Sequence, residues 1–550
     1  AFYLPPSSIF PYLEYPIPSA KSSLHENHER FIRMTTPSSI VDVTVLSEWL
    51  GLQTSASKTS LAQRLTQWNS SPAHLEQNRQ NAVRMKNVLV QDPTFYTELR
   101  SHFTALSVIE KEVTPLLQCP SDVEKETYGE LLFFRPLLQP LNSVPLLLPF
   151  WSLLRIYLLP GLSLLLPLLT MLAPYFILPY VLCLPIPFQN YIYLLHSLLS
   201  GQLTDATCSP SPPSGAFPHP TSLLKQLAII LVTLVQGIIQ PYWTYSHLRT
   251  VGNVVETMGR HLMELRTRYE VIEARLREKG IGFHACPLPP FLSSPHAVSE
   301  AILHPMYIRL ALKYLGTLEC HVELLHHPSV HPVQWVTSER PVFCLKKTYD
   351  IHVPEGKQRR FSVSMGGESS SHALLTGPNK GGKSTVLRGV ALAALLAHTY
   401  GCAVGHLTAT PFHALYVCLK PDDLPGTKSR FEREIEFTAQ TLRPHPGPIL
   451  VLLDELYHST NPPDALSSCL HYSNRLWVAP SVISIISTHL FEWVEQSDPR
   501  LIQRLCCPAE YDAEGTLRFQ YELKPGICRV SSVELLLRQN GLLLSPSAPL

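Results

Sequence analysis

The stretch ALLTGPNKGGKS (373–384), followed by TVLRGVALAALLAH (385–398), decides the fold of the C-terminal part of this chain. Apolar residues that favour a buried strand lead into a glycine-rich loop of the form GxxxxGK[ST], and an apolar helix pattern follows. This order predicts a phosphate-binding loop, whose backbone N–H groups and helix N-terminus surround phosphate. We therefore expect an α/β P-loop ATPase domain over residues 331–550.

The loop residues carry the first expected contacts with a nucleotide. Lys383 should reach the β- and γ-phosphates of ATP, and the Ser384 hydroxyl should bind Mg²⁺. ATP and Mg²⁺ are thus the predicted cofactors. The whole loop is expected to line the nucleotide site: Gly377, Pro378, Asn379, Lys380, Gly381, Gly382, Lys383, Ser384 and Thr385.

A second apolar run, ILVLLDE (449–455), ends in two carboxylates. The run reads as a buried parallel strand, and Asp454 at its end could hold Mg²⁺ directly or through water. Glu455 is placed to polarise the attacking water as a general base. We expect this acidic pair at the tip of a strand next to the phosphate-loop strand.

A third apolar run, VISIIS (482–487), is followed by Thr488 and His489. A histidine just beyond a strand of such a sheet can contact the γ-phosphate. His489 therefore joins Lys383 and Glu455 in the expected catalytic set.

Bulk composition bounds the remaining possibilities. A chain of 550 residues predicts two to four domains. Lys and Arg number 44 against 43 Asp and Glu, so no global basic field draws the chain onto nucleic acid. The 12 cysteines are scattered without a CxxC pair, which favours a reducing, ATP-containing compartment for the ATPase domain.

The middle of the chain is strongly apolar. No Lys, Arg, Asp or Glu occurs between Arg155 and Asp205, and none occurs in QLAIILVTLVQGIIQPYW (226–243). A membrane-crossing helix needs about 20 apolar residues, so we predict a membrane-embedded helical insert over 141–248. The alternative is a buried hairpin of an all-α domain. If the flanking segments pack together, the protein is multi-pass with an even number of crossings, two or four, in a membrane that the sequence does not identify.

Helical patterns flank the apolar region. Residues 1–45 are Pro- and Ser-rich and predicted to be irregular, whereas 46–140 and 249–330 read as the two parts of an all-α core and lever. The second part has a seam with heptad-like spacing, in either a coiled coil or a packed amphipathic helix. Its members are Val251, Val255, Met258, Leu262, Leu265, Tyr269, Ile272 and Leu276.

Four segments together resemble the MutS family, in that family's order and at similar spacing. The resemblance implies an ABC/MutS-type ATPase fold over about 330–540, preceded by the helical core and lever. The segments are TGPNKGGKST (376–385), Asp422 to Glu434 with the signature Gly426-Thr-Lys-Ser-Arg-Phe431, DELYHSTNPPD (454–464) and STHL (487–490).

The resemblance also implies paired ATPase domains, in a homodimer or a heterodimer of related chains. Each nucleotide would then lie between the phosphate loop of one subunit and the signature serine of the other, which is Ser429 here. Adenine would stack on an aromatic side chain, for which Phe343 and Tyr521 are the candidates. GICRVSSVELLLRQNGL (526–542) is similar to the family's closing segment, which docks on the partner subunit.

Several departures from the family pattern leave two functions open. Arg430 replaces the signature threonine, Tyr457 to Asn461 replace a glycine-rich turn, and no Phe-x-Glu mismatch-reading element stands out. The apolar insert also lies where MutS proteins carry the clamp that touches DNA. The protein is then either a membrane-tethered, DNA-binding repair ATPase or a membrane-tethered, ATP-driven switch or scaffold that no longer binds DNA. A transporter is disfavoured because the apolar segment contains no charge to line a path.

Overall fold

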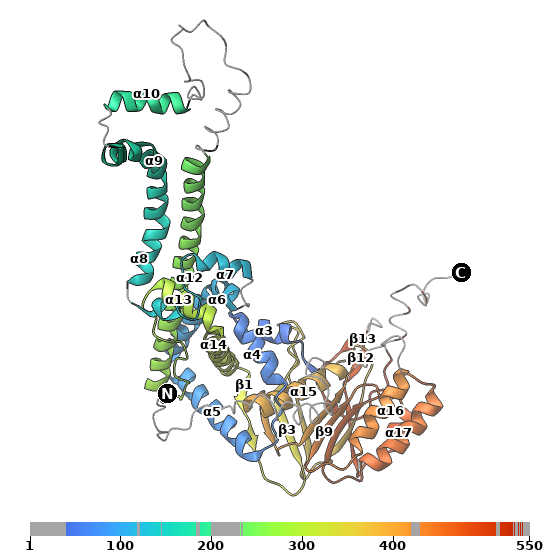
Figure 1. Cartoon of the computed structure of the whole chain (residues 1–550). Coiled ribbons are helices and arrows are strands. Elements are labelled where there is room, and N and C mark those ends of the chain that lie inside the picture. The colour runs from blue at the N-terminus through green and yellow to red at the C-terminus, as the bar shows by residue number, and fades with distance from the viewer. Residues whose placement is uncertain are drawn as a thin grey trace. The chain divides into compact units, whose positions relative to one another are not determined.

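The computed structural model describes residues 40–117, 122–144, 146–182, 187–199, 235–419, 429–512 and 517–531, with a few single residues beside these ranges (Figure 1). Most of the predicted irregular segment 1–45, and much of the apolar segment 226–243, lie outside the described residues. The chain forms two compact units, which are described separately below. Unit 1 comprises 1–107, 269–285 and 311–550, and unit 2 comprises 108–268 and 286–310.

The predicted lever ranges do not coincide with these units. Ranges 46–140 and 249–330 are each divided between both units. The physical reason is that α6 (Pro93–Leu117) and α12 (Gln240–Glu278) are continuous helices with residues in each unit.

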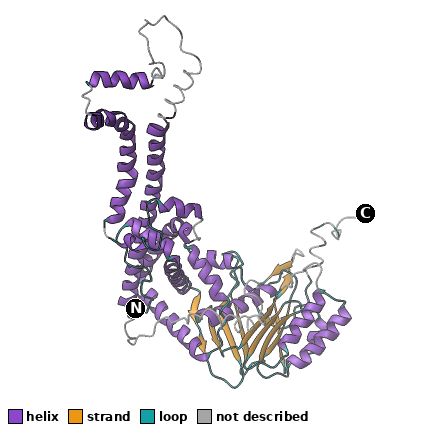
Figure 2. Ribbon diagram, in the orientation of Figure 1, coloured by secondary structure: helices purple, strands orange, loops and turns teal. Residues whose placement is uncertain are grey.

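Unit 1 is built on a six-stranded sheet, and Figure 2 draws its strands in orange. All neighbouring strands pair in parallel except β14, which is antiparallel to β11. The strands β5, β9 and β10 are buried along their whole length, which explains their continuous apolar sequences. The order is β14 (Lys524–Pro525), β11 (Ile502–Cys506), β5 (His372–Thr376), β10 (Val482–Ser487), β9 (Ile449–Leu453) and β8 (Ala414–Cys418).

Smaller sheets and helices complete this α/β domain and confirm the predicted fold class of its C-terminal part. A four-stranded sheet has the order β2 (Gln334–Trp335), β7 (His406–Ala409), β3 (Val342–Thr348) and β4 (Phe361–Gly366). Two further strand pairs are β1 (Val330–Pro332) with β6 (Cys402–Val404), and β12 (Ala509–Tyr511) with β13 (Leu517–Phe519). The helices are α15 (Lys383–Tyr400), which is buried almost throughout, α16 (Arg430–Thr441), α17 (Pro462–Leu476) and α18 (Phe491–Gln496).

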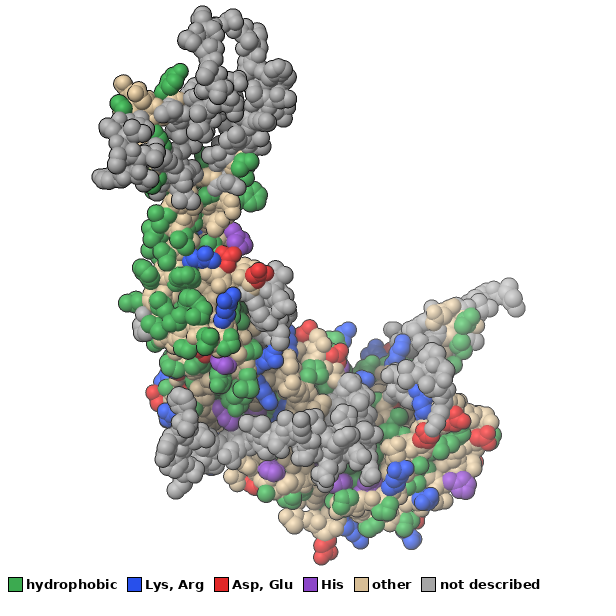
Figure 3. Space-filling model, in the orientation of Figure 1, with side chains coloured by type: hydrophobic (Ala, Val, Ile, Leu, Met, Phe, Trp, Pro, Cys, Tyr) green, Lys and Arg blue, Asp and Glu red, His purple; other side chains and the backbone are tan. Residues whose placement is uncertain are grey.

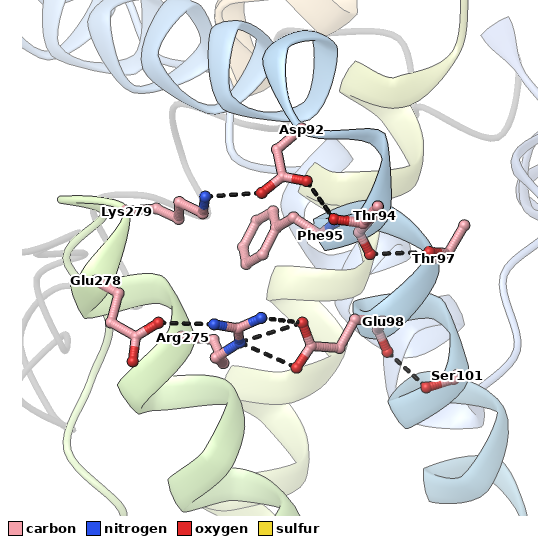
Figure 4. A network of polar contacts seen from close by, with 9 residues as sticks. All are labelled: Asp92, Thr94, Phe95, Thr97, Glu98, Ser101, Arg275, Glu278 and Lys279. Carbon is pink, nitrogen blue, oxygen red and sulfur yellow. Dashed lines mark hydrogen bonds and ion pairs between the residues drawn. The ribbon is translucent and has the colours of Figure 1, made fainter.

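The helical part of unit 1 joins segments that lie far apart in the sequence. Figure 4 shows Arg275 of α12 forming a two-pronged ion pair with Glu98 of α6, with the closest N–O distance 2.6 Å. Lys279 pairs with Asp92 at 2.7 Å. The start of α6 and the end of α12 are therefore in direct contact. The other helices here are α3 (Val43–Leu50), α4 (Ser55–Leu65), α5 (Pro72–Gln91) and most of α14 (Pro305–His326).

A buried glutamate in α14 makes the stability of unit 1 depend on pH. Glu323 is 4 % exposed; one carboxylate oxygen accepts a hydrogen bond from the Tyr96 hydroxyl at 2.9 Å, and the other has no partner among the described residues. Burial raises the pKa of Glu323 above its usual value. Because the pKa of Glu323 is raised in the folded protein, its uncharged carboxyl group favours the folded state. This contribution to stability is fully present below the unfolded pKa and is lost as pH rises through the folded pKa.

We expect Glu323→Gln to stabilise the protein at pH 7, by about 1–3 kcal/mol, because it removes a buried charge with an unsatisfied oxygen. The gain should shrink as pH falls and the carboxyl group of Glu323 takes up its proton, because its pKa is raised by burial. Chemical denaturation at several pH values measures it, with the exposed Glu368→Gln as the matched control. A gain that is constant with pH would exclude the ionised carboxylate as its source.

Unit 2 is helical in all of its described elements. It includes the rest of α6 and α12, and one helical stretch, Leu147–Leu165, that is long and apolar enough to cross a membrane and is mostly unburied. The remaining elements are α7 (Asp122–Gly129), η1 (Gln139–Ser143), α8 (Leu147–Leu153), the π-helical turn η2 (Leu154–Leu158), α9 (Leu159–Leu182), α10 (Phe188–Leu199), the π-helical turn η4 (Val235–Ile239) and α13 (Ser294–Leu303).

The predicted seam of α12 is confirmed by burial. Every member is buried except Met258, which is partly exposed. Gly259 lies inside α12 although glycine has a low helix propensity. A Cβ at this position would lie within 2.5 Å of the Ser294 backbone at the start of α13. The glycine is required because α13 approaches α12 so closely.

We expect Gly259→Ala to destabilise unit 2 by about 1–3 kcal/mol, because the obstructing atoms are backbone and cannot rotate away. Gly161→Ala is the matched control, since a Cβ at this helical glycine meets nothing within 4 Å. Thermal unfolding of the two variants measures the difference. Equal melting temperatures would contradict the close approach.

Candidate active site

The predicted nucleotide residues gather at the carboxyl ends of β5, β10 and β9. We expected the acidic pair on a strand next to β5, and this is wrong in detail, because β10 lies between β5 and β9. The two tips nevertheless meet, since the Ser384 hydroxyl donates a 2.5 Å hydrogen bond to Asp454 Oδ2. Parallel strands end at one edge of the sheet, so loops from alternate strands can converge there.

The phosphate loop has the backbone that its glycines allow. Gly377 and Gly382 adopt φ values of 151° and 104°, in the region that side chains disfavour, and α15 begins directly after Gly382. A Cβ at Gly377 would lie 2.9 Å from the Cys507 carbonyl oxygen. Gly377, Pro378 and Gly381 are buried, Gly382, Ser384 and Thr385 are partly buried, and Asn379 and Lys380 are exposed.

Lys383 is folded back into its own loop. Its Nζ donates to the carbonyl oxygens of Gly377 at 2.9 Å and Pro378 at 3.3 Å, and it lies 3.8 Å from Glu455 Oε1. Burial lowers the pKa of this lysine. The ammonium group is thus held at the loop, facing the acidic pair, where it can turn towards a triphosphate.

Ser384 and Asp454 form the candidate Mg²⁺ site. Their oxygens are the hard ligands that Mg²⁺ prefers, and this ion usually binds one or two carboxylates together with substrate phosphates and water. Asp454 is held by a second hydroxyl, since Ser487 donates to its Oδ1 at 2.5 Å. The residues present therefore fit the ion.

Ser487 is a site residue that the sequence interpretation missed. It ends β10, donates to Asp454, and accepts a 2.9 Å hydrogen bond from the Glu455 backbone N–H. The available signal was its place at the carboxyl end of a strand directly before Thr488 and His489. Ser487 fixes both acidic residues on the neighbouring strand.

Glu455 and His489 lie together beside Lys383. His489 Nε2 is 3.2 Å from Glu455 Oε1 and 2.9 Å from Lys383 Nζ. One ring nitrogen cannot donate to the carboxylate and accept from the ammonium at once, so only one contact is a hydrogen bond in any one tautomer. The His489 contact, followed by Lys383, lowers the pKa of Glu455 to about 2, and the carboxylate is ionised at neutral pH.

The backbone at Glu455 is unusual for a side-chain-bearing residue. Its φ is 52°, in the left-handed region, and this conformation is kept by the hydrogen bond from its N–H to Ser487. Such positions cost of the order of 1–3 kcal/mol and concentrate at functional sites. From this backbone the carboxylate lies beside Lys383 and His489.

The candidate adenine contacts differ in what they offer. Phe343 in β3 is fully buried and lies near Phe412, so its ring has no surface free to stack on adenine. Tyr521 is 46 % exposed, and its ring would lie 3.6 Å from a Cβ on Gly382. In this structure, only Tyr521 of these two side chains borders the phosphate loop.

Ser429, the candidate contact to a partner subunit, caps α16. It is exposed, its hydroxyl accepts from the Glu432 N–H, and its own N–H donates to the Glu432 carboxylate. Asp422 to Lys428 lie outside the described residues. Whether Ser429 reaches a second subunit stays a prediction.

The departures from the family pattern contact one another through Glu434. Arg430 pairs with this buried carboxylate at 3.2 Å, and the Ser459 hydroxyl donates to it at 3.2 Å. Tyr457, two residues after Glu455, shares a 2.7 Å hydrogen bond with Thr438 of α16. The altered signature helix and the altered turn after β9 are therefore joined.

Fold and site together define a P-loop ATPase-type domain. Comparison with known proteins refines this class: residues 373–535 match MutS domain V. DNA mismatch repair protein MutS from two strains of Thermus thermophilus is 37 % identical over 161 residues in each case. Over this segment the chain is therefore similar to MutS proteins. The matches with the two relatives span 28 % of this chain and 19 % of each relative's length.

Proposed function

We propose that this protein is a MutS-type ATPase that binds ATP with Mg²⁺ and hydrolyses it. The observation that carries the proposal is the convergence of Lys383, the Ser384–Asp454 pair and the Glu455–His489 pair at one edge of the sheet. The matching MutS proteins are named for DNA mismatch repair, and the match covers the nucleotide-binding part.

Each residue has a distinct role in the proposed reaction. Lys383 leaves the loop carbonyls and binds the β- and γ-phosphates, while the N–H groups at the start of α15 surround them. Ser384 and Asp454 would hold Mg²⁺, which would supply positive charge against the phosphates. Glu455 orients and polarises the attacking water, and His489 contacts the γ-phosphate.

Purified protein tests this proposal directly. We expect it to retain ATP when Mg²⁺ is present and to release phosphate, and to lose phosphate release when EDTA removes the metal. A protein that fails to bind nucleotide in the presence of Mg²⁺ would contradict the proposal at its base.

We further propose that two ATPase domains pair, as a homodimer or a heterodimer of related chains, with Ser429 contacting the nucleotide of the partner. The exposed position of Ser429 at the first turn of α16 supports this, because a helix N-terminus favours phosphate. ATP-dependent dimerisation, measured by light scattering, should be lost in Ser429→Arg.

Membrane tethering is the second part of the proposal. Figure 3 shows hydrophobic side chains gathered on the described surface of unit 2 over α8 and the start of α9. Water-exposed apolar areas of this extent are typical of protein or membrane contacts. The contacts of Glu98 with Arg275 and of Asp92 with Lys279 join the chain before and after the apolar segment. They support our proposal of an even number of full crossings, two or four.

Flotation with lipid vesicles tests the tether. Full-length protein should rise with the lipid, whereas a variant lacking 145–246 should stay in the dense fraction and still hydrolyse ATP. A full-length protein that does not float would contradict the tether while leaving the ATPase proposal standing.

The second candidate function is a membrane-tethered switch without DNA contact. The insertion of the apolar segment between the two halves of the helical lever favours it. DNA binding measured against salt distinguishes the candidates, because phosphate contacts give a linear fall of log K with log salt, with a slope of about −0.9 per contact. Absence of binding at low salt would remove the repair function.

A further inference from the structure

The surface of unit 2 changes character along two antiparallel helical segments. The rings of Tyr157 in η2 and Tyr245 in α12 have centroids 5.8 Å apart, and Ile156 lies against Gly252. Farther along the first segment, α9 packs against η4. The two segments therefore run antiparallel, from Ile156 into α9 and from η4 into α12. Tyr157 and Tyr245 lie side by side and mark the same level on both segments.

Beyond this level the helices expose apolar side chains. No charged residue follows Arg155 until Asp205, and none precedes Arg249 back to residue 226. A surface of this length without charge matches hydrocarbon better than water. The exposed large side chains near the level include Leu158, Leu159, Leu162, Leu164, Leu165, Val235, Ile238 and Ile239.

On the other side of the level the same helices carry paired charges beside exposed apolar side chains such as Phe150 and Leu153. Arg155 lies 3.8 Å from the Glu130 carboxylate, and its guanidinium is 5.9 Å from the Trp151 ring. Farther along α12, Arg268 pairs with Glu264 at 2.7 Å. These groups require water or polar surroundings.

Four aromatic residues separate the two regions: Tyr157, Tyr242, Trp243 and Tyr245, which we call the aromatic rim. Trp243 is 72 % exposed and Tyr242 is 64 % exposed. Arg249 donates to the Tyr245 hydroxyl at 2.8 Å. Residues 242–249 span about 10 Å of helix at about 1.5 Å per residue, close to the roughly 5–8 Å headgroup layer on each side of a bilayer.

We propose that the aromatic rim lies in the headgroup layer of a lipid bilayer, with the Leu158 side in hydrocarbon and Arg155 and Arg249 facing water or headgroups. Amphipathic Trp and Tyr rings favour this layer, and arginine stems can extend towards it. This inference rests on the proposed membrane tether and specifies how deeply unit 2 enters the bilayer. The membrane surface crosses η2 near Tyr157 and α12 near Trp243.

Tryptophan quenching by brominated phosphatidylcholine measures this depth. Full-length protein is placed in vesicles whose lipids carry bromine either near the headgroup end of the chain or near its tip. We expect shallow bromines to quench more than deep ones, and Trp243→Phe to lose most of the shallow quenching. Trp335→Phe is the matched control: Trp335 lies in unit 1 and its Nε1 has no hydrogen-bond partner among the described residues.

Each outcome has a distinct meaning. If the protein floats but deep bromines quench Trp243 as strongly as shallow ones, or nothing quenches it, the proposed position of the aromatic rim is contradicted. The proposed membrane tether is then still supported. Protein that does not float overturns the tether and the rim together. Retained shallow quenching in Trp335→Phe, with its loss in Trp243→Phe, supports the rim.

Discussion

Replacing Glu455 with glutamine should abolish most ATP hydrolysis while ATP binding survives. Glutamine keeps the size of the side chain and its carbonyl oxygen, but it cannot act as a base towards water. Loss of a general base typically costs about 10²- to 10⁴-fold in rate. Steady-state phosphate release measures the rate, and equilibrium binding of a fluorescent ATP analogue with Mg²⁺ measures the affinity.

Two controls make this result specific. Glu368→Gln alters an exposed carboxylate in the same unit and should leave the rate unchanged. Single-turnover measurements separate the chemical step from product release. If Glu455→Gln hydrolyses ATP at the wild-type rate, Glu455 is not the general base. His489 is then the remaining candidate.

Replacing Lys383 with alanine should act at the earlier step, nucleotide binding. The variant loses the charged donor to the β- and γ-phosphates, and hydrogen bonds to charged groups contribute about 1.5–3 kcal/mol each. We expect the affinity for ATP·Mg²⁺ to fall by about 10- to 100-fold, since each ~1.4 kcal/mol is a factor of ten.

The exposed Lys357→Ala is the matched control, because it removes an equal charge from the same unit away from the loop. Isothermal titration of both variants gives the comparison. The contacts of Lys383 with Gly377 and Pro378 are lost in the variant as well, so its thermal stability is measured alongside. Unchanged affinity in a folded Lys383→Ala would place the triphosphate elsewhere.

The turn after β9 is joined to the start of α16 beside the candidate site. Glu434 receives contacts from Arg430 at the start of α16 and from Ser459 in the turn that follows Glu455. Burial raises the pKa of Glu434. A movement of the signature helix would therefore reach the turn directly through one carboxylate.

Local sequence signals were enough to predict several parts of this protein. The phosphate loop follows from glycines at fixed spacing, and the buried strands β5, β9 and β10 follow from unbroken apolar runs. The seam of α12 follows from helical periodicity, and its burial agrees at all positions but Met258. Each of these signals depends on residues within one element.

Which elements contact one another could not be predicted from these local signals. Strand order is set by packing between segments far apart in the chain, so the insertion of β10 between β5 and β9, and the role of Ser487, could not be read from spacing. The same holds for Phe343, whose aromatic character suggested stacking while its neighbours bury it, and for Gly259, whose purpose is the backbone of Ser294. The burial of a residue depends on the segment that packs against it. A pattern within one segment does not identify that partner segment.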